Sequence, residues 1–221
     1  MGRFNRFVLT LLAATLVVMV VAGTASAATY SGVAYCNEPT SVSTNAPTNT
    51  TLAAAEALGT QCASFSETAI NFSGDAPGNY NLNGFLTGNG AGFGITYLNG
   101  FNGASNMNNT LWVFTGVANF TNGQVFNVEH DDGTNMYVNG VNVLSAPGPT
   151  APVVTPFTYS GTTGNFNFQF IFTECCGGAV DYSTTLVPPV SGSVPEPGSL
   201  LLLCSGLLGI GGAAIWRCLV S

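Results

Sequence analysis

Alternating apolar and polar residues mark the second half of the chain as a series of short β-strands. The clearest case runs from Asn165 to Thr173, where every second residue is a phenylalanine and all four therefore point to one face. These residues are Phe166, Phe168, Phe170 and Phe172. A strand with four aromatic side chains on one face needs a second layer to cover them. The pattern therefore predicts an all-β fold, and a β-sandwich fits the length of this part of the chain.

Further strands are expected around Trp112 and Phe114 and from Val125 to Glu129. Two more, from Met136 to Val138 and from Val141 to Val143, are separated by Asn139-Gly140 alone. A two-residue Asn-Gly loop between apolar runs is a strong signal for a tight β-hairpin. Asn139 and Gly140 are therefore predicted to form the turn.

The first half of the chain carries a weaker pattern. Residues 37–60 are rich in Thr, Ser and Ala and contain one possible short helix, from Thr51 to Leu58. Residues 71–109 are crowded with Gly and Asn, including Asn83-Gly84 and Asn99-Gly100, and such pairs favour turns between short strands. Aromatic residues recur too regularly there for a solvated linker, so short strands and long loops are predicted.

The N-terminus has the three regions of a secretory signal peptide. Arg3 and Arg6 precede an apolar stretch from Phe7 to Ala22, and the small residues Ala25-Ser26-Ala27 follow. Residues 1–27 are therefore predicted to be removed by signal peptidase, with cleavage after Ala27.

The C-terminus has a second long apolar segment. From Gly198 to Trp216 there is no charged residue, and a helix of this length would span about 28 Å, which matches a bilayer core. A transmembrane helix is therefore predicted at about 198–216. It is preceded by Val194-Pro195-Glu196-Pro197 and followed by Arg217.

A Pro-Glu-Pro signal, a spanning helix and a terminal basic residue resemble the sorting tail of PEP-CTERM proteins. The tail departs from that pattern in having Arg217 alone where several basic residues are usual. The resemblance implies export by a Gram-negative bacterium that makes extracellular polysaccharide, transient anchoring by the helix, and processing by a membrane protease of the exosortase type. The expected destination is the cell surface or the extracellular matrix. An ordinary C-terminal membrane anchor is the alternative.

These segments divide the chain into five parts. Residues 1–27 are the signal peptide and 28–109 the Gly/Asn-rich N-terminal part of the ectodomain. Residues 110–186 form the predicted β core, 187–193 a linker, and 194–221 the sorting tail. The segment between signal and tail is long enough for one domain with its own core.

Charge excludes one class of partner. The 3 basic residues, Arg3, Arg6 and Arg217, all lie in the terminal segments, whereas all but one of the 10 carboxylates lie between them. Nucleic-acid binding needs cationic groups on the protein and is therefore excluded. Carboxylates without basic partners suit a divalent cation, which outside the cell would be calcium. An acidic, soluble surface is the simpler interpretation of the carboxylates as a group.

Four cysteines lie in the exported body: Cys36, Cys62, Cys175 and Cys176. Disulfides persist in an oxidising compartment, and four cysteines allow 3 pairings. The adjacent Cys175 and Cys176 could close on each other only with a strained peptide, whereas bridges from them to Cys36 and Cys62 would hold the N-terminal segment to the last strand. A metal site is less favoured because the spacing is not CxxC and His130 is the one histidine.

The stretch around Asp131 and Asp132 has the form of a family signature. It consists of a strand, the paired aspartates, Gly133, a second strand and the Asn139-Gly140 hairpin. This order resembles the PA14 family, whose β-sandwich domains occur in bacterial toxins, glycosidases and fungal adhesins. The resemblance continues through the aromatic strand to the segment from Glu174 to Val180, and covers about residues 110–186.

In sugar-binding PA14 domains, adjacent aspartates at this point chelate calcium, and the ion holds vicinal sugar hydroxyls. The resemblance therefore implies that Asp131 and Asp132 are calcium ligands. Neighbouring carboxylates that face one way repel each other and favour a cation, and aiming both at one ion can require a cis peptide bond. Calcium takes six to eight oxygens, so Glu129, Asn135 and Asn139 are candidates for further ligands.

A structural role is the alternative for Asp131-Asp132-Gly133. Aspartate side chains can bond the backbone just ahead of them, and Gly133 would then take a positive φ in a turn. His130 is expected to pack or hydrogen-bond beside this turn.

No catalytic residue is predicted. The exported body has no Lys or Arg, His130 has no nucleophile elbow as partner, and a glycosidase pair of Glu129 and Glu174 would need a defined separation across a cleft. The expected function is adhesive or structural, within the extracellular polysaccharide or biofilm matrix, with possible calcium-dependent glycan binding. A passive matrix protein without a specific ligand is the alternative, and an accessory module of a carbohydrate-active enzyme is less favoured.

Overall fold

The computed structural model describes residues 29–73, 80–88, 92–178 and 180–186. The signal peptide predicted at 1–27, the linker at 187–193 and the sorting tail at 194–221 lie outside the described residues. Among the described residues, no helix has both the length and the apolar character needed to cross a bilayer. The helix predicted at 198–216 lies in the part that is not described.

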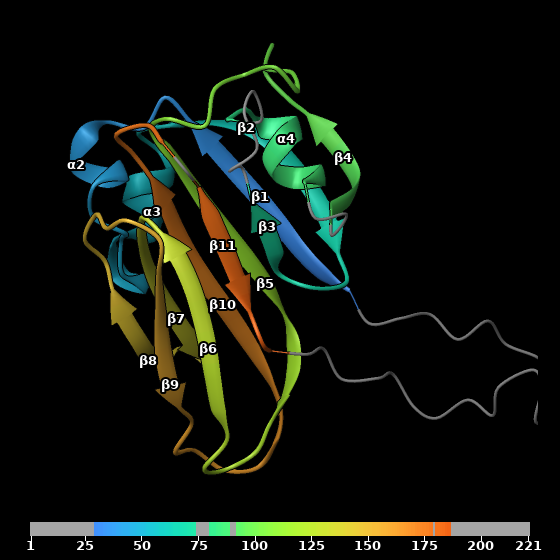
Figure 1. Ribbon diagram of the computed structural model, residues 1–221, viewed down its shortest axis with the longest axis vertical. Helices are drawn as coiled ribbons and strands as arrows, with labels where there is room; N and C mark the ends of the chain where they lie inside the picture. The colour runs from blue at the N-terminus through green and yellow to red at the C-terminus, as the bar shows by residue number, and fades with distance from the viewer. Residues whose placement is uncertain (1–28, 74–79, 89–91, 179, 187–221) are drawn as a thin grey trace, which may run out of the picture. The chain divides into compact units, whose positions relative to one another are not determined.

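The described strands form two antiparallel sheets that face each other (Figure 1). The larger has 7 strands in the order β4-β2-β1-β5-β10-β7-β8, and the smaller has 4 in the order β3-β11-β6-β9. The larger sheet comprises β1 (Tyr30–Cys36), β2 (Thr60–Glu67), β4 (Gly92–Tyr97), β5 (Thr110–Phe120), β7 (Gly133–Val138), β8 (Val141–Ala146) and β10 (Gly164–Glu174). The smaller comprises β3 (Asn71–Ser73), β6 (Val125–Asp131), β9 (Val153–Thr158) and β11 (Asp181–Thr184). The prediction of an all-β sandwich is confirmed.

The aromatic face of β10 forms the centre of the core between the sheets. Phe168, Phe170 and Phe172 are buried, and Phe166 is partly buried at the end of the cluster. Phe172 stacks on Tyr182 of β11, in the opposite sheet, with ring centroids 4.4 Å apart. The alternation read from the sequence therefore identified the inward face of this strand correctly.

Two short helices cover part of the outer face of the larger sheet. These are α2 (Thr40–Ser43) and α3 (Asn49–Glu56), and α3 begins and ends two residues before the predicted helix from Thr51 to Leu58. Val42, Leu52 and Ala55 of these helices join a second buried cluster with Leu111, Val113, Tyr137 and Ile171 of the sheet. Ile171, on the face opposite the phenylalanines, is therefore buried as well.

The Gly/Asn-rich segment contains a helix that was not predicted. Asn83-Gly84 lies inside α4 (Leu82–Thr87), so the turn expected at this pair is wrong. The reason is the residue before the helix: the side-chain oxygen of Asn81 accepts a hydrogen bond from the Gly84 N–H at 2.8 Å and caps the first turn. Asn99-Gly100, in contrast, has both residues at positive φ, as a turn requires.

The N-terminal part belongs to the same sandwich as the predicted β core. Strand β1 pairs with β2 on one side and with β5 on the other.

Cys36 and Cys62 form a disulfide between β1 and β2, with Cα atoms 5.7 Å apart. The second disulfide joins the adjacent Cys175 and Cys176, so the bridges from this pair to Cys36 and Cys62 are not formed. Neighbouring positions on paired strands bring Cys36 and Cys62 together instead.

Two buried glutamates of this fold, Glu67 and Glu38, have no hydrogen-bond partner among the described residues on either carboxyl oxygen. Glu67, at the end of β2, is fully buried, and neither of its oxygens has a hydrogen-bond partner among the described residues. Burial raises the pKa of Glu67 to about 9. Glu38 is likewise buried without partners in this part of the chain, and burial followed by the charge of Glu56 raises its pKa to about 7.

Candidate metal and ligand site

The aspartate pair lies where the chain passes from one sheet to the other. Asp131 is the last residue of β6 in the smaller sheet, and Gly133 is the first residue of β7 in the larger sheet. Across the strands, Asp131 pairs with Asp181 and Gly133 pairs with Thr173. The peptide bond between Asp131 and Asp132 is cis. Asp131 is 8% exposed and Asp132 is 5% exposed, so both carboxylates lie inside this corner.

The carboxylate of Asp132 is held by two segments that are distant in sequence. Its Oδ1 accepts a hydrogen bond from the Thr150 N–H at 3.0 Å, and its Oδ2 accepts one from the Cys175 N–H at 2.8 Å. The turn interpretation expects instead a bond to the backbone just ahead of the aspartate. These two bonds fix the orientation of the carboxylate and leave further lone pairs on both oxygens.

A third carboxylate, Glu174, completes the cluster. Glu174 ends β10 and is 1% exposed. Ligand oxygens of Asp131, Asp132 and Glu174 all lie within 4.8 Å of one another. The Oε1 of Glu174 accepts a hydrogen bond from the Tyr80 hydroxyl at 2.6 Å, whereas the Oε2 of Glu174 is buried with no hydrogen-bond partner among the described residues.

The electrostatics of the cluster follow from its burial. Burial is the main cause that raises the pKa of Glu174, to about 9; the bond from Tyr80 opposes this, and the negative charges of Asp132 and Asp131 add to it. No Lys or Arg occurs in the described residues to offset the cluster. Three carboxylates with one unpartnered buried oxygen form an arrangement that a cation would stabilise.

Gly133 is required here for a reason other than the predicted turn. Its φ is not positive, and the residue forms part of β7. A Cβ at this position would overlap the carbonyl oxygen of Pro147, and would lie 2.7 Å from the carbonyl carbon. The close approach of the Pro147 carbonyl to the strand is what excludes a side chain.

We expect Gly133→Ala to lower the free energy of unfolding by about 2 kcal/mol, because the added methyl group must displace a backbone carbonyl. The measurement is urea unfolding of the variant beside Gly148→Ala, where a Cβ would meet no atom within 4 Å. Equal unfolding free energies for the two variants would show that the Pro147 segment moves aside freely.

The other predicted ligands have different partners. Glu129 accepts a hydrogen bond from Ser183 and is not in the carboxylate cluster. The Asn135 amide donates to the carbonyl oxygens of Ala46 and Pro47 and accepts from Ser145. Asn139 and Gly140 form the β7–β8 turn, with φ of 49° and 77°. The ring nitrogens of His130 lie 2.6 Å from the Asp132 carbonyl oxygen and 2.9 Å from the Thr155 hydroxyl, which is a hydrogen-bonding role.

Sequence reasoning did not name Glu174 as a partner of the aspartates. Glu174 lies far from them along the chain, and only the pairing of β10 with β7 brings the two segments together. The available signal was its position at the start of the segment that resembles the final PA14 turn.

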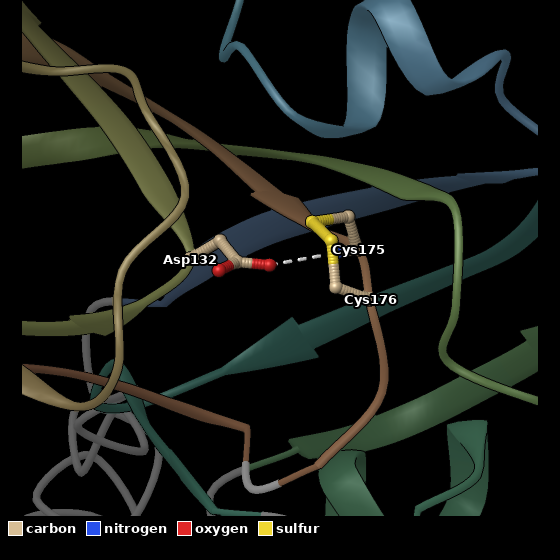
Figure 2. A group of neighbouring side chains, drawn as sticks. All are labelled: Asp132, Cys175 and Cys176. Carbon is tan, nitrogen blue, oxygen red and sulfur yellow. Dashed lines mark hydrogen bonds between the residues drawn. A yellow bond between two sulfur atoms is a disulfide. The ribbon is translucent and has the colours of Figure 1, made fainter.

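The Cys175–Cys176 disulfide lies directly beside Asp132 (Figure 2). Both sulfur atoms are within 4.8 Å of a carboxylate oxygen of Asp132. Cys175 is buried, whereas Cys176 is exposed and has a φ of 64°. The disulfide thus forms part of the surface next to the carboxylate cluster.

The fold is similar to that of known PA14 domains. It matches the PA14 sugar-binding domain of an RTX adhesin with a TM-score of 0.50 and 22% identity, covering 73% of this chain and 90% of that one. The PA14 domain of the antifreeze protein MpAFP matches with a TM-score of 0.49 and 17% identity, and the match covers 75% of this chain and 83% of that domain's chain. A GH31 alpha-xylosidase from Xanthomonas citri matches with a TM-score of 0.37 and 12% identity, covering 72% of this chain and 14% of the enzyme.

These findings define the described residues as a PA14-like β-sandwich. Residues 193–217 match the PEP-CTERM protein-sorting motif. The chain therefore combines a PA14-like domain with a sorting motif that indicates export to the cell surface or beyond it. No curated protein is significantly similar to the chain.

Proposed function

We propose that this protein is an adhesive component of the extracellular polysaccharide or biofilm matrix, and that it binds glycan through calcium. Asp131, Asp132 and Glu174 would hold the ion, and the ion would hold hydroxyl groups of the sugar. The observation that carries the proposal is the cluster of three buried carboxylates, in which one oxygen of Glu174 has no hydrogen-bond partner within the described part of the chain. The PA14-like fold supports it, since one similar structure is a sugar-binding domain.

The donor atoms fit calcium better than a softer metal. All three side chains offer carboxylate oxygens, which are the ligands that calcium prefers. Cys175 and Cys176 also lie beside Asp132, but their sulfurs are joined in a disulfide and offer no thiolate to zinc. Calcium takes six to eight oxygens, so three carboxylates leave room for sugar hydroxyls and water.

The terminal segments would deliver the domain to its place of action. We propose that signal peptidase cleaves after Ala27, that the helix at 198–216 anchors the protein transiently, and that an exosortase-type protease then acts at Val194-Pro195-Glu196-Pro197. The match of residues 193–217 to the sorting motif supports this sequence of events.

A passive matrix protein without a ligand remains the second candidate. The observation in its favour is that each carboxylate oxygen of Asp132 already accepts a backbone hydrogen bond. A purely structural corner between the sheets would use the aspartate in the same way.

Thermal unfolding separates the two functions. With millimolar calcium, the melting temperature of the full chain in mild detergent should rise by several degrees over its value in chelator, because a ligand that binds only the folded state stabilises it by about 2.7 kcal/mol at a hundredfold excess over its Kd. Asp131→Asn should abolish the rise, whereas Glu129→Gln, a carboxylate on the same strand outside the cluster, should retain it.

A glycan array probed with and without calcium then tests the ligand. Binding that requires calcium and is lost in Asp131→Asn supports the adhesive function. A calcium-induced rise in melting temperature without glycan binding would leave a calcium-stabilised matrix protein. The same melting temperature in calcium and in chelator would leave the passive role.

A further inference from the structure

The Cys175–Cys176 disulfide and the carboxylate cluster share one short segment. Glu174 supplies a carboxylate to the cluster, and the next residue, Cys175, donates its N–H to the carboxylate of Asp132 at 2.8 Å (Figure 2). Two of the three carboxylates in the cluster therefore depend on the position of this segment.

The disulfide restrains a segment that would otherwise be free to change conformation. A bridge between adjacent cysteines closes a small ring that includes the peptide bond between them. Cys176 is held at a φ of 64°, a region that residues other than glycine rarely occupy. Gly177 and Gly178 follow, both at positive φ, and the Gly177 N–H donates to the Cys175 carbonyl oxygen at 2.7 Å. Without the ring, two glycines and an exposed cysteine would leave the end of β10 with few restraints.

We propose that the Cys175–Cys176 disulfide is a positioning element of the cation site, and that reducing this bond weakens calcium binding while the sandwich stays folded. The inference rests on the proposed binding of calcium by Asp131, Asp132 and Glu174. Hydrogen bonds that orient metal ligands typically contribute 10- to 100-fold to metal affinity. The cation site would then reach its full affinity only after the cysteines are oxidised, which follows export.

The reduction itself is an ordinary thiol–disulfide exchange with an added dithiol. A thiolate of the dithiol attacks one cysteine sulfur, which forms a mixed disulfide and releases the other cysteine. The second thiol of the reagent then attacks the mixed disulfide and releases the first cysteine as well. The dithiol loses two electrons and becomes a cyclic disulfide, while the two protein sulfurs gain the electrons and two protons. Cys176 is exposed, whereas Cys36 and Cys62 are buried, so mild reduction should select the adjacent pair.

The test is calcium titration calorimetry on the full chain in mild detergent, before and after mild treatment with a dithiol. Alkylation and mass spectrometry identify which cysteines were reduced. We expect the Kd for calcium to rise about tenfold or more on reduction of Cys175 and Cys176. The variant Cys175→Ser/Cys176→Ser should show the weaker affinity from the start and should not respond to dithiol.

Controls separate positioning from a general effect on folding. The melting temperature in chelator should be nearly the same for the oxidised protein and the double-serine variant, and Cys36→Ala/Cys62→Ala should keep the calcium affinity of the wild-type protein. Equal calcium affinity before and after reduction would overturn the inference and leave the calcium site intact. Loss of folding on reduction would also overturn it, since the disulfide would then hold the fold. An oxidised wild-type protein that binds no calcium would instead refute the proposed function.

Discussion

The variant Glu67→Gln will lose stability with rising pH more slowly than the wild-type protein, by about 1.4 kcal/mol for each pH unit between about pH 5 and pH 8.5. Glu67 is fully buried without a hydrogen-bond partner in the described part of the chain, and burial raises its pKa from 4.5 to about 9. The carboxyl group therefore stays protonated in the folded protein over a range in which the unfolded chain has lost that proton. Over the whole range the difference amounts to several kcal/mol.

The sign follows from the number of protons that each state binds. Between the two pKa values the folded state binds more protons at Glu67 than the unfolded state does, so the unfolding free energy falls as the pH rises. Stability due to the neutral carboxyl is complete below about pH 4.5 and is lost as the pH rises through about 9. Glutamine does not titrate, so its own cost of burial is the same at every pH.

Urea unfolding at several pH values, with chelator present throughout, measures this slope. Glu38→Gln is the matched comparison, because the pKa of Glu38 is raised only to about 7 and its contribution to the slope should end near that pH. Tyr30 of β1 and Tyr182 of β11 are the titratable groups whose pKa values Glu67 itself raises, and both stay neutral over this range. If Glu67→Gln and the wild-type protein have the same slope, the carboxyl group is solvated in solution.

The fold was predictable where one strand carries its own pattern. The four phenylalanines of β10 identified a buried face because side chains alternate along a strand, and Asn139-Gly140 identified a hairpin because both residues tolerate positive φ. Burial of Ile171 was not predictable, since it depends on helices α2 and α3 packing on the outer face. Helix α4 was missed because the pair Asn83-Gly84 favours a turn. The hydrogen bond from the Gly84 N–H to the Asn81 side chain caps the first turn and stabilises the helix instead.

The candidate site was predictable only in part, for a similar reason. Adjacency in sequence indicated Asp131 and Asp132, but Glu174 joins them through the pairing of Thr173 with Gly133 across two strands. Asn135 was a reasonable candidate by residue type and is instead used to hold the carbonyl groups of Ala46 and Pro47. Tertiary contacts decide which polar residues are free to bind a ligand, and the spacing of residues along the sequence does not reveal those contacts.

Replacing Glu174 with glutamine should change stability in opposite directions with and without calcium. In calcium, the variant should bind the ion on the order of 100-fold more weakly, equivalent to about 2.7 kcal/mol, because a buried carboxylate of the cluster is lost. In chelator at neutral pH, the variant should be more stable than the wild-type protein by about 1–3 kcal/mol. Burial raises the pKa of Glu174 to about 9, so the wild-type protein must take up a proton there on folding, and a neutral amide avoids that cost. Its oxygen can still accept from Tyr80, and its amide hydrogens can be donated to the aspartates.

Calcium titration calorimetry and unfolding in chelator measure the two effects on one protein sample, with Glu129→Gln as the matched variant outside the cluster. The reversal of sign distinguishes a ligand from a structural carboxyl group. A structural Glu174 bonded to Tyr80 would make the variant equal or less stable in both conditions and would leave calcium affinity unchanged. A calcium ligand is instead a destabilising group in the empty site and a stabilising one in the occupied site. Burial beside Asp131 and Asp132 forces the group to take up a proton when the cation is absent, whereas a bound cation stabilises its charged form.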